Sequence, residues 1–209
     1  MDLYSYVVRY DSGFAPNPFY GYCTLATCKP DIRNTASIGD WIIGVGSADK
    51  RVNQGGRLVY AMRVGETLSF NDYYNDERFI RKRPNLFGSR KQARGDNIYQ
   101  KTNGTWRQLD SFHSMPDGSR NEDHIRRDTK VDKVLISNFY VYFGGNGPKL
   151  PSSLKSNGRS ICHRGIGRSK FRGNLDSDLR MIGKFESWLR SLDVTGYVGQ
   201  PYDWDDNQK

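Results

Sequence analysis

The sequence predicts an α+β fold in which a curved, mostly antiparallel sheet or a small β-barrel carries a C-terminal helix. Three observations indicate this class. Two apolar segments, 41–45 and 57–64, are joined by a polar loop and predict a pair of strands. Other short apolar or aromatic segments are separated by turns rich in Gly, Pro and Asn. Residues from about 175 to 192 place apolar side chains three or four positions apart, which is typical of an amphipathic helix.

The elements of the first half follow from apolar periodicity and from the residues that interrupt it. Strands are predicted over four segments, 4–9, 19–27, 41–45 and 57–64. Pro30 ends the second strand, because proline cannot donate to a β-ladder. The Gly39-Asp40 turn begins the third strand. Thr67 is expected to cap a short helix that reaches Tyr74.

The second half is predicted in the same way. Residues 76–94 are basic and irregular, because Pro84 and Gly88 interrupt any helix. The Asn103-Gly104 pair is a strong hairpin signal, and 105–109 forms the return strand. Residues 115–128 are read as a polar loop and 131–143 as the most buried strand region. Without internal repeats or a low-complexity linker, residues 1–209 are expected to form a single domain, closed by the C-terminal helix.

The charge balance indicates a polyanionic partner. The 209 residues carry a formal net charge of +9 at pH 7, which favours nucleic acid or nucleotides, with DNA as the expected form. A membrane partner is not expected, since no apolar run approaches the length of about 20 residues that a spanning helix needs. The N-terminal residues lack the pattern of a signal peptide, and the three cysteines suit a reduced compartment. A cytoplasmic location is therefore expected.

Two basic segments, 78–94 and 155–172, are the candidates for phosphate contact. The alternative is that they form a solvated charged surface. The residues predicted to bind phosphate are Arg81, Lys82, Arg83, Arg90, Lys91, Arg94, Arg164, Arg168, Lys170 and Arg172.

A base-binding pocket needs an aromatic platform and a few hydrogen-bonding groups. Residues of these types lie at or beside predicted strand ends, and the pocket is predicted to contain Trp41, Ser47, Tyr60, Asp96, Asn97 and Tyr99. The alternative is that Trp41 and Tyr60 belong to the core and that Asp96 stabilises a turn.

Acid–base chemistry would require a histidine and a carboxylate in one pocket. His113 is the candidate histidine, with Asp96 or Asp128 among the carboxylates near it in the sequence. The alternative is that this histidine only bonds to loop backbone. The cysteines at 23, 28 and 162 are expected to be buried apolar residues rather than metal ligands or nucleophiles. No phosphate-binding glycine motif is present, so no nucleotide cofactor is expected. Because the cysteines do not form a convincing metal site, no metal is expected either.

Several segments together resemble one family. The segments are 4–19, 23–30, the Gly39-Asp40-Trp41 turn, 95–99, 135–137 and 142–144. They resemble the nucleotide-modification-associated domain family, second type, over nearly the whole chain. Residues 39–64 are also similar to base-binding barrels of the pseudouridine-synthase-and-archaeosine-transglycosylase type, which implies a PUA-like β-barrel. No catalytic motif of the family is carried over to residues of this chain.

The resemblance implies binding of nucleic acid or nucleotides with modified bases, in phage or bacterial DNA modification or defence. The alternative is an enzyme that makes, removes or cleaves at a modified base through His113 and a nearby aspartate. A third possibility is a partner protein, structural or toxin-associated, without a base pocket.

Overall fold

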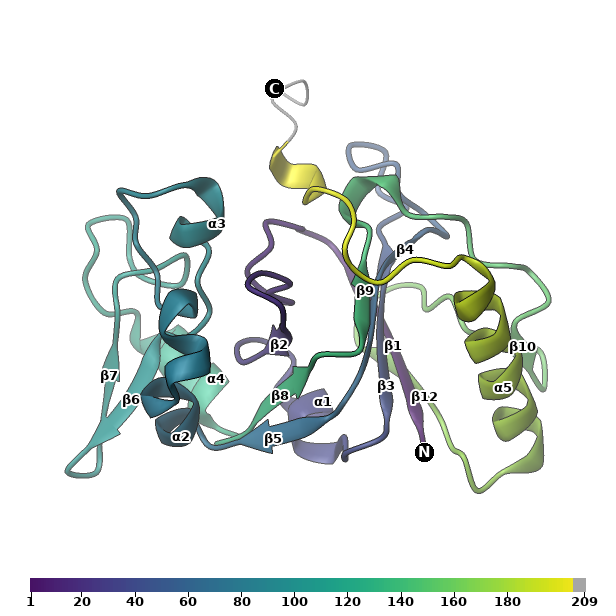
Figure 1. Cartoon of the computed structure of the whole chain (residues 1–209), viewed down its shortest axis with the longest axis horizontal. Helices are drawn as coiled ribbons and strands as arrows, with labels where there is room; N and C mark the ends of the chain where they lie inside the picture. The colour runs from purple at the N-terminus through teal and green to yellow at the C-terminus, as the bar shows by residue number, and fades with distance from the viewer. Residues whose placement is uncertain (205–209) are drawn as a thin grey trace. The chain divides into compact units, whose positions relative to one another are not determined.

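The computed structural model describes residues 1–204 (Figure 1). Contacts between residues divide the chain into two compact units, and each unit is assembled from separate segments. The first unit contains Met1–Asp11, Ala36–Val64 and the described residues from Phe139 to Trp204. The second contains Ser12–Thr35 and Gly65–Asn138. The expectation of a single domain over residues 1–209 stays a prediction.

The first unit is built on a six-stranded mixed sheet with the strand order β12-β1-β3-β4-β9-β13. Its strands are β1 (Leu3–Val8), β3 (Trp41–Gly46), β4 (Leu58–Arg63), β9 (Tyr140–Tyr142), β12 (Arg168–Phe171) and β13 (Gly196–Tyr197). Two of the pairings, β1 with β3 and β9 with β13, are parallel, and the other three are antiparallel.

The predicted PUA-like barrel is wrong, because this sheet is open. Its edge strands, β12 and β13, do not pair with each other. Strand β13 contains only two residues, and its partner β9 contains three. This edge of the sheet therefore has few backbone N–H and C=O groups that could pair with another strand to close a barrel. The prediction of strands at 41–45 and 57–64 is confirmed by β3 and β4, which pair antiparallel.

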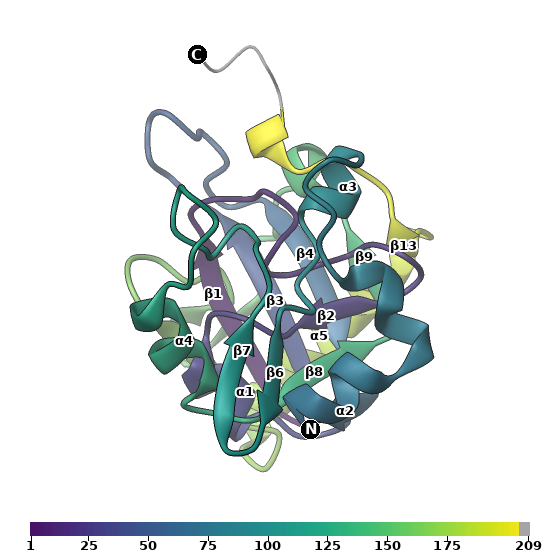
Figure 2. The same ribbon diagram turned by 90° about the vertical axis from the view of Figure 1, so that its left-hand side faces the viewer.

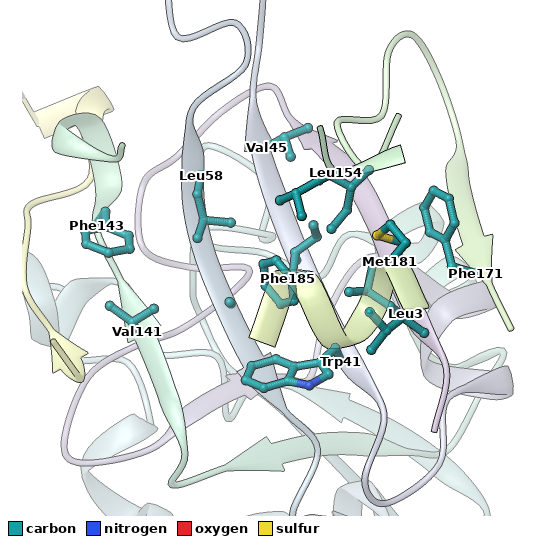
Figure 3. Close-up of a cluster of buried hydrophobic side chains, with 14 residues drawn as sticks. Leu3, Trp41, Val45, Leu58, Val141, Phe143, Leu154, Phe171, Met181 and Phe185 are labelled. Carbon is teal, nitrogen blue, oxygen red and sulfur yellow. The ribbon is translucent and has the colours of Figure 1, made fainter. Parts of the chain in front are cut away.

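Helix α5 (Asp176–Ser191) confirms the predicted C-terminal helix and packs against the six-stranded sheet of this unit. Met181, Ile182 and Phe185 point into a buried cluster with residues of the sheet, as Figure 3 shows for several of them. The remaining members of this core include Leu3, Ile43, Val45, Leu58, Val141, Leu154, Ile161 and Phe171. Leu179, which the apolar pattern also includes, is 47% exposed. The core therefore buries fewer apolar side chains of α5 than the helical periodicity of the sequence predicts.

Gly44, in the middle of β3, lies where two side chains leave no room for another. A Cβ atom at this position would lie 2.5 Å from Tyr60 Cε1 and 2.6 Å from Val8 Cγ2. We expect Gly44→Ala to lower the free energy of unfolding by about 1–3 kcal/mol through overpacking.

The control for this prediction is Gly183→Ala. Gly183 lies inside α5, and nothing would meet its Cβ within 4 Å. That variant should be more stable by roughly 0.5–1 kcal/mol, because alanine favours the helix. Urea unfolding of both variants checks the pair, and equal effects would contradict the packing argument.

Shorter elements complete the first unit. They are the 3₁₀ helices η2 (Gly144–Asn146) and η3 (Tyr202–Trp204), and the two-residue strands β10 (Lys155–Ser156) and β11 (Arg159–Ser160), which pair with each other.

The second unit contains a three-stranded antiparallel sheet with the order β2-β8-β5 and a separate hairpin. The sheet strands are β2 (Cys23–Leu25), β5 (Glu66–Leu68) and β8 (Val134–Ser137). The hairpin strands, β6 (Tyr99–Thr102) and β7 (Thr105–Gln108), can be followed in Figure 2. Asn103 and Gly104 both have positive φ, at 50° and 81°, as a two-residue hairpin turn requires.

The helices of the second unit are short. They are α1 (Pro30–Thr35), α2 (Phe70–Asn75), the 3₁₀ helix η1 (Glu77–Lys82), α3 (Arg90–Ala93) and α4 (Glu122–Thr129). The polar segment 115–128 was predicted as a loop, but most of α4 lies in it. The side chain of Asn121 caps this helix by accepting from His124 N. Ser69, not Thr67, caps α2.

A second core cluster, which includes Phe14, Phe70, Phe79 and Ile98, supports these elements. None of the helices within residues 1–204 combines the length and the apolar character that crossing a membrane requires.

Candidate active site

Cys28 lies in the turn between β2 and α1, in the second unit. Cys28 and Lys29 both adopt the left-handed region, with φ of 59° and 40°, which is unfavourable for residues other than glycine. The turn is held by two distant side chains. Cys28 N donates to Asp128 Oδ1 at 3.0 Å, and Cys28 O accepts from Arg33 Nε at 2.9 Å. A strained backbone fixed in this way is typical of functional sites.

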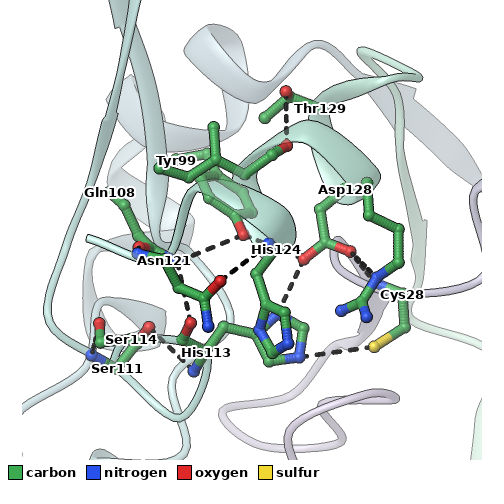
Figure 4. A network of polar contacts seen from close by, with 12 residues as sticks. Cys28, Tyr99, Gln108, Ser111, His113, Ser114, Asn121, His124, Asp128 and Thr129 are labelled. Carbon is green, nitrogen blue, oxygen red and sulfur yellow. Dashed lines mark hydrogen bonds and ion pairs between the residues drawn. The ribbon is translucent and has the colours of Figure 1, made fainter. Parts of the chain in front are cut away.

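His113 follows the β6–β7 hairpin and is 5% exposed. Its Nδ1 lies 2.8 Å from Asp128 Oδ2, and its Nε2 lies 3.6 Å from Cys28 Sγ. Because an ionised carboxylate can only accept, Nδ1 carries the proton in this bond. Nε2, the other ring nitrogen, faces the sulfur and is the atom that can exchange a proton with it. Figure 4 shows the imidazole between the thiol and the carboxylate.

Asp128, on α4, is completely buried and accepts several hydrogen bonds. Besides Cys28 N and His113 Nδ1, Tyr99 OH donates to Oδ2 at 3.0 Å and Arg127 Nε donates to Oδ1 at 3.4 Å. Burial alone would raise the pKa of Asp128, but the hydrogen bond and charge of His113 outweigh it and lower the pKa. Asp128 is therefore a charged carboxylate that fixes the orientation of His113.

The two neighbouring histidines have opposite pKa shifts. Burial works against the charge of His113, but its hydrogen bonds to Asp128 and Cys28 raise its pKa to about 9. Burial and the nearby His113 lower the pKa of His124, whose ring centroid is 4.2 Å from that of His113. The Nδ1 atom of His124 is buried and has no hydrogen-bond partner among residues 1–204. One charged and one neutral imidazole at neutral pH is an arrangement suited to proton transfer.

The raised pKa of His113 predicts how stability depends on pH. The folded pKa of about 9 exceeds the value of about 6.5 for a free histidine, so protonated His113 stabilises the fold. This contribution is complete below about pH 6.5 and is lost as the pH rises towards 9. We expect the difference in unfolding free energy between wild type and His113→Gln to shrink by up to about 3 kcal/mol over that range.

Urea unfolding of both proteins between pH 6 and 9.5 measures this difference. Lys82, whose pKa burial lowers to about 8, also titrates in this range with the opposite sign. Its contribution is present in both proteins and cancels in the comparison. A difference that does not change with pH would contradict the assignment of a protonated His113.

Aromatic side chains adjoin His113 within the second unit. The ring of Phe14 lies 4.6 Å from that of His113 and 5.5 Å from that of Phe112, measured between centroids. Phe112 is 46% exposed, and the guanidinium carbon of Arg94 lies 4.4 Å from its centroid. An exposed ring with a stacked arginine is the kind of surface on which nucleobases stack.

Comparison with known proteins gives a family for this chain. The family model described as nucleotide modification associated domain 2 (Nmad2) matches residues 1–208. The chain belongs to this family. No curated protein and no solved structure matches the chain. The resemblance inferred from the sequence is thereby confirmed, and the Nmad2 description places the chain in a nucleotide-modification context.

The structure brings one predicted acid–base pair of this Nmad2 chain together and not the other. His113 and Asp128 are in direct contact. The carboxylate of Asp96 instead accepts from Thr24 Oγ1 at 2.7 Å and Tyr73 OH at 2.8 Å. Thr24 Oγ1 also accepts from the buried ammonium of Lys82 at 3.1 Å. Asp96 therefore belongs to a buried polar network of the second unit.

The six residues of the predicted base pocket are divided between the two units. Trp41, Ser47 and Tyr60 lie in the first unit, whereas Asp96, Asn97 and Tyr99 lie in the second. All six are buried and hydrogen-bonded within their own unit. A single pocket formed by all six stays a prediction.

The predicted phosphate ligands are divided in the same way. Arg81, Lys82, Arg83, Arg90, Lys91 and Arg94 belong to the second unit, and Arg164, Arg168, Lys170 and Arg172 to the first. Lys82 is completely buried, and its ammonium donates to Asn17, Tyr22 and Thr24. Arg81 and Arg83 lie over the rings of Tyr20 and Tyr74. We therefore omit Lys82 from the phosphate contacts proposed below.

Cys28 is the candidate site residue that sequence reasoning missed, because the cysteines were expected to be buried apolar residues. The informative signal is its position between a strand and a proline-initiated helix, because nucleophiles often occupy sharp strand-to-helix turns.

The side chains of Cys28, His113 and Asp128 are also the group in which a metal ion could fit. One ligand atom each from Cys28, His113 and Asp128 lies within 4.8 Å of the others. The carboxylate and His113 Nδ1 are already bonded to each other, which leaves only the sulfur and Nε2 for a metal. Zinc sites use at least three protein ligands, more than the two atoms that remain here. The arrangement therefore fits a thiol–imidazole–carboxylate triad better than a metal centre.

Proposed function

We propose that this Nmad2 chain is a thiol-dependent enzyme that adds or removes an acyl-type substituent on the base of a nucleotide or nucleic acid. The observation that carries the proposal is the alignment of Cys28 Sγ, His113 and Asp128, with separations of 3.6 and 2.8 Å. A nucleophile beside a base that a third group orients is the general arrangement for acyl transfer. The Nmad2 family supports a nucleotide as the substrate.

The proposed reaction has two stages. His113 Nε2 takes the proton of the Cys28 thiol before the attack, and the resulting thiolate attacks the carbonyl carbon of an N-acylated base. The imidazolium returns this proton to the leaving nitrogen as the C–N bond breaks, which leaves a thioester on Cys28. Water, or an acceptor amine in the reverse sense, then attacks the thioester while His113 takes its proton and returns it to the sulfur. No oxidant or reductant is needed.

Other residues hold this arrangement in place. Asp128 keeps the proton of His113 on Nδ1, and Tyr99 helps to fix the carboxylate. Phe112, which is partly exposed, is the aromatic side chain proposed to stack with the base. The proposal includes DNA as the nucleic acid and a phage or bacterial modification or defence system as the setting.

Hydrolysis of an acylated base tests the proposal. N4-acetyl-2′-deoxycytidine would be supplied as nucleoside, as monophosphate and within an oligonucleotide, and its deacetylation followed by chromatography. p-Nitrophenyl acetate serves as a substrate without a base. We expect turnover by wild type and by Cys162→Ser, and none by Cys28→Ser. Unchanged turnover by Cys28→Ser, or no release from any of the four substrates, would overturn the proposal.

Binding of nucleic acid without chemistry is a second candidate function. Arg159, Arg168, Lys170 and Arg172 line one hollow of the first unit beside β12. Asp178 also lines the hollow and pairs with Arg159 at 3.3 Å. Lys170 pairs with Asp2 at 2.8 Å. The cationic side chains outnumber the acidic ones at this surface, which suits a phosphate backbone.

The salt dependence of binding tests this second candidate. If both arginines contact phosphate, the double variant Arg168→Gln/Arg172→Gln should reduce the slope of log K against log salt by about 2, since each contact contributes about 0.9. Fluorescence anisotropy with a duplex oligonucleotide measures the slope. Lys184→Gln, an exposed change on α5, is the control and should leave it unchanged. Equal slopes for all three proteins would exclude a phosphate contact at β12.

A further inference from the structure

The first unit contains a cavity of about 530 Å³ that the thiol chemistry does not use. It is lined by residues of β3, β4 and β9, by the C-terminal half of α5 and by the segment after this helix. The aromatic and charged side chains that line it include Trp41, Arg63, Phe139, Glu186, Arg190 and Asp193. This volume is within the range of about 300–1,000 Å³ that small-molecule sites occupy.

Trp41 and Phe139 contribute aromatic rings to the cavity wall. Phe139 is 49% exposed, and its ring centroid lies 5.8 Å from that of the buried Trp41. Trp41 is fixed from behind by Phe185, with a centroid distance of 5.5 Å and nearly perpendicular rings. Phe139 therefore offers a flat, supported aromatic surface to a ligand.

The polar groups of the wall carry both signs of charge. Trp41 Nε1 donates to Glu186 Oε1 at 2.9 Å, which orients this carboxylate. Arg190 Nη2 lies 3.8 Å from Glu186 Oε2, which is a long ion pair. Arg63 Nε donates to Gly39 O at 3.2 Å. Asp193 also lines the cavity. A purely apolar ligand would take these groups from water without replacing their hydrogen bonds, which is costly.

We propose that this cavity binds a nucleobase carried by a nucleoside monophosphate. The base lies against Phe139, the carboxylates of Glu186 and Asp193 accept from its N–H groups, and Arg63 and Arg190 contact the phosphate. Carboxylates accept from base amino groups, and arginine is suited to phosphate. The inference goes beyond the function proposed above, because it requires neither Cys28 nor catalysis.

Calorimetric titration of the full chain tests this site. The ligands are the four 2′-deoxynucleoside monophosphates, with deoxyribose 5-phosphate as the ligand without a base. At least one nucleotide should bind about 10-fold or more tightly than the sugar phosphate, as expected from stacking of one base. Arg63→Gln and Glu186→Gln should each weaken that nucleotide about 10-fold through loss of a charge-assisted contact.

The variants separate recognition from folding. Gln at position 186 can still accept from Trp41 Nε1, and Arg63 is exposed, so both proteins should keep the unfolding temperature of wild type. Lys184→Gln, on the exposed surface of α5, is the matched control and should bind as wild type does. Nucleotide affinity that matches the sugar phosphate, or that neither variant changes, would overturn the proposal, as would no binding at about 1 mM ligand.

The same titration in Cys28→Ser distinguishes this proposal from the one above. We expect unchanged nucleotide affinity in that variant, because Cys28 does not line the cavity. Binding that persists without turnover would leave this site in place while the thiol-dependent reaction fails. Turnover of the acylated base without nucleotide binding at this cavity would support the thiol-dependent reaction and overturn the nucleotide site.

Discussion

Replacing His113 by Gln is expected to slow the alkylation of Cys28 by iodoacetamide about 100-fold at pH 7, which is at the lower end of what a positioned proton acceptor contributes. The reactive species is the thiolate, and His113 Nε2 is the group 3.6 Å from Cys28 Sγ that can take the thiol proton. Glutamine has no side-chain group that titrates near neutral pH, so it cannot replace this function.

Peptide mass spectrometry measures the alkylation rate at each cysteine of the same molecules. Cys162 is an internal control, because it is half-buried and burial raises its pKa. His163→Gln, in the first unit, is the matched histidine variant and should leave the rate at Cys28 unchanged. An equal rate at Cys28 in wild type and His113→Gln would show that the imidazole does not activate the thiol.

Replacing Arg33 by Met is expected to lower the free energy of unfolding by about 3–5 kcal/mol, the range observed when one partner of a buried charged group is removed. Arg33 is completely buried and donates to four backbone carbonyls of the second unit. The acceptors are the carbonyl oxygens of Cys28, Asp128, Val131 and Lys133. Methionine fills a similar volume but donates nothing, so these buried acceptors lose their partner.

Urea unfolding measures the loss, with Arg126→Gln as the control. Arg126 is exposed and pairs only with the exposed Asp123 at 2.6 Å among the described residues, so its loss should cost less than about 1 kcal/mol. A cost below about 1 kcal/mol for Arg33→Met would contradict the role given to this side chain. Because Arg33 holds the carbonyl of Cys28, the variant should also show slower alkylation of Cys28.

The parts of the fold that the sequence predicts are those with strong local signals. Strands β3 and β4 follow from apolar runs, the β6–β7 hairpin from Asn103-Gly104, and α5 from its helical periodicity. The barrel was wrong because closure depends on whether distant edge strands pair, and no local pattern encodes that. Helix α4 was missed because Ile125 is its only large apolar residue, and its stability comes from the Asn121 cap and from burial of Ile125 and Asp128.

The candidate site was predicted only in part for a related reason. His113 and Asp128 are 15 positions apart, and each residue type suggested acid–base chemistry. Cys28 is 85 positions from His113, and the two meet because β2 and α1 are built into the same unit as the β6–β7 hairpin and α4. Residue types and spacing carry no information on a contact of this kind. The left-handed backbone of Cys28, held by Arg33 and Asp128, is likewise visible only in the structure.

The most direct test of the central claim is to trap the acyl group on the enzyme. The protein would be mixed with p-nitrophenyl acetate or N4-acetyl-2′-deoxycytidine, quenched in acid within seconds, digested and mapped by mass spectrometry. The account predicts one acetyl group on Cys28 in wild type and a much smaller yield in His113→Gln. Acetylation confined to Cys162 or lysines, while Cys28 stays unmodified, would contradict it.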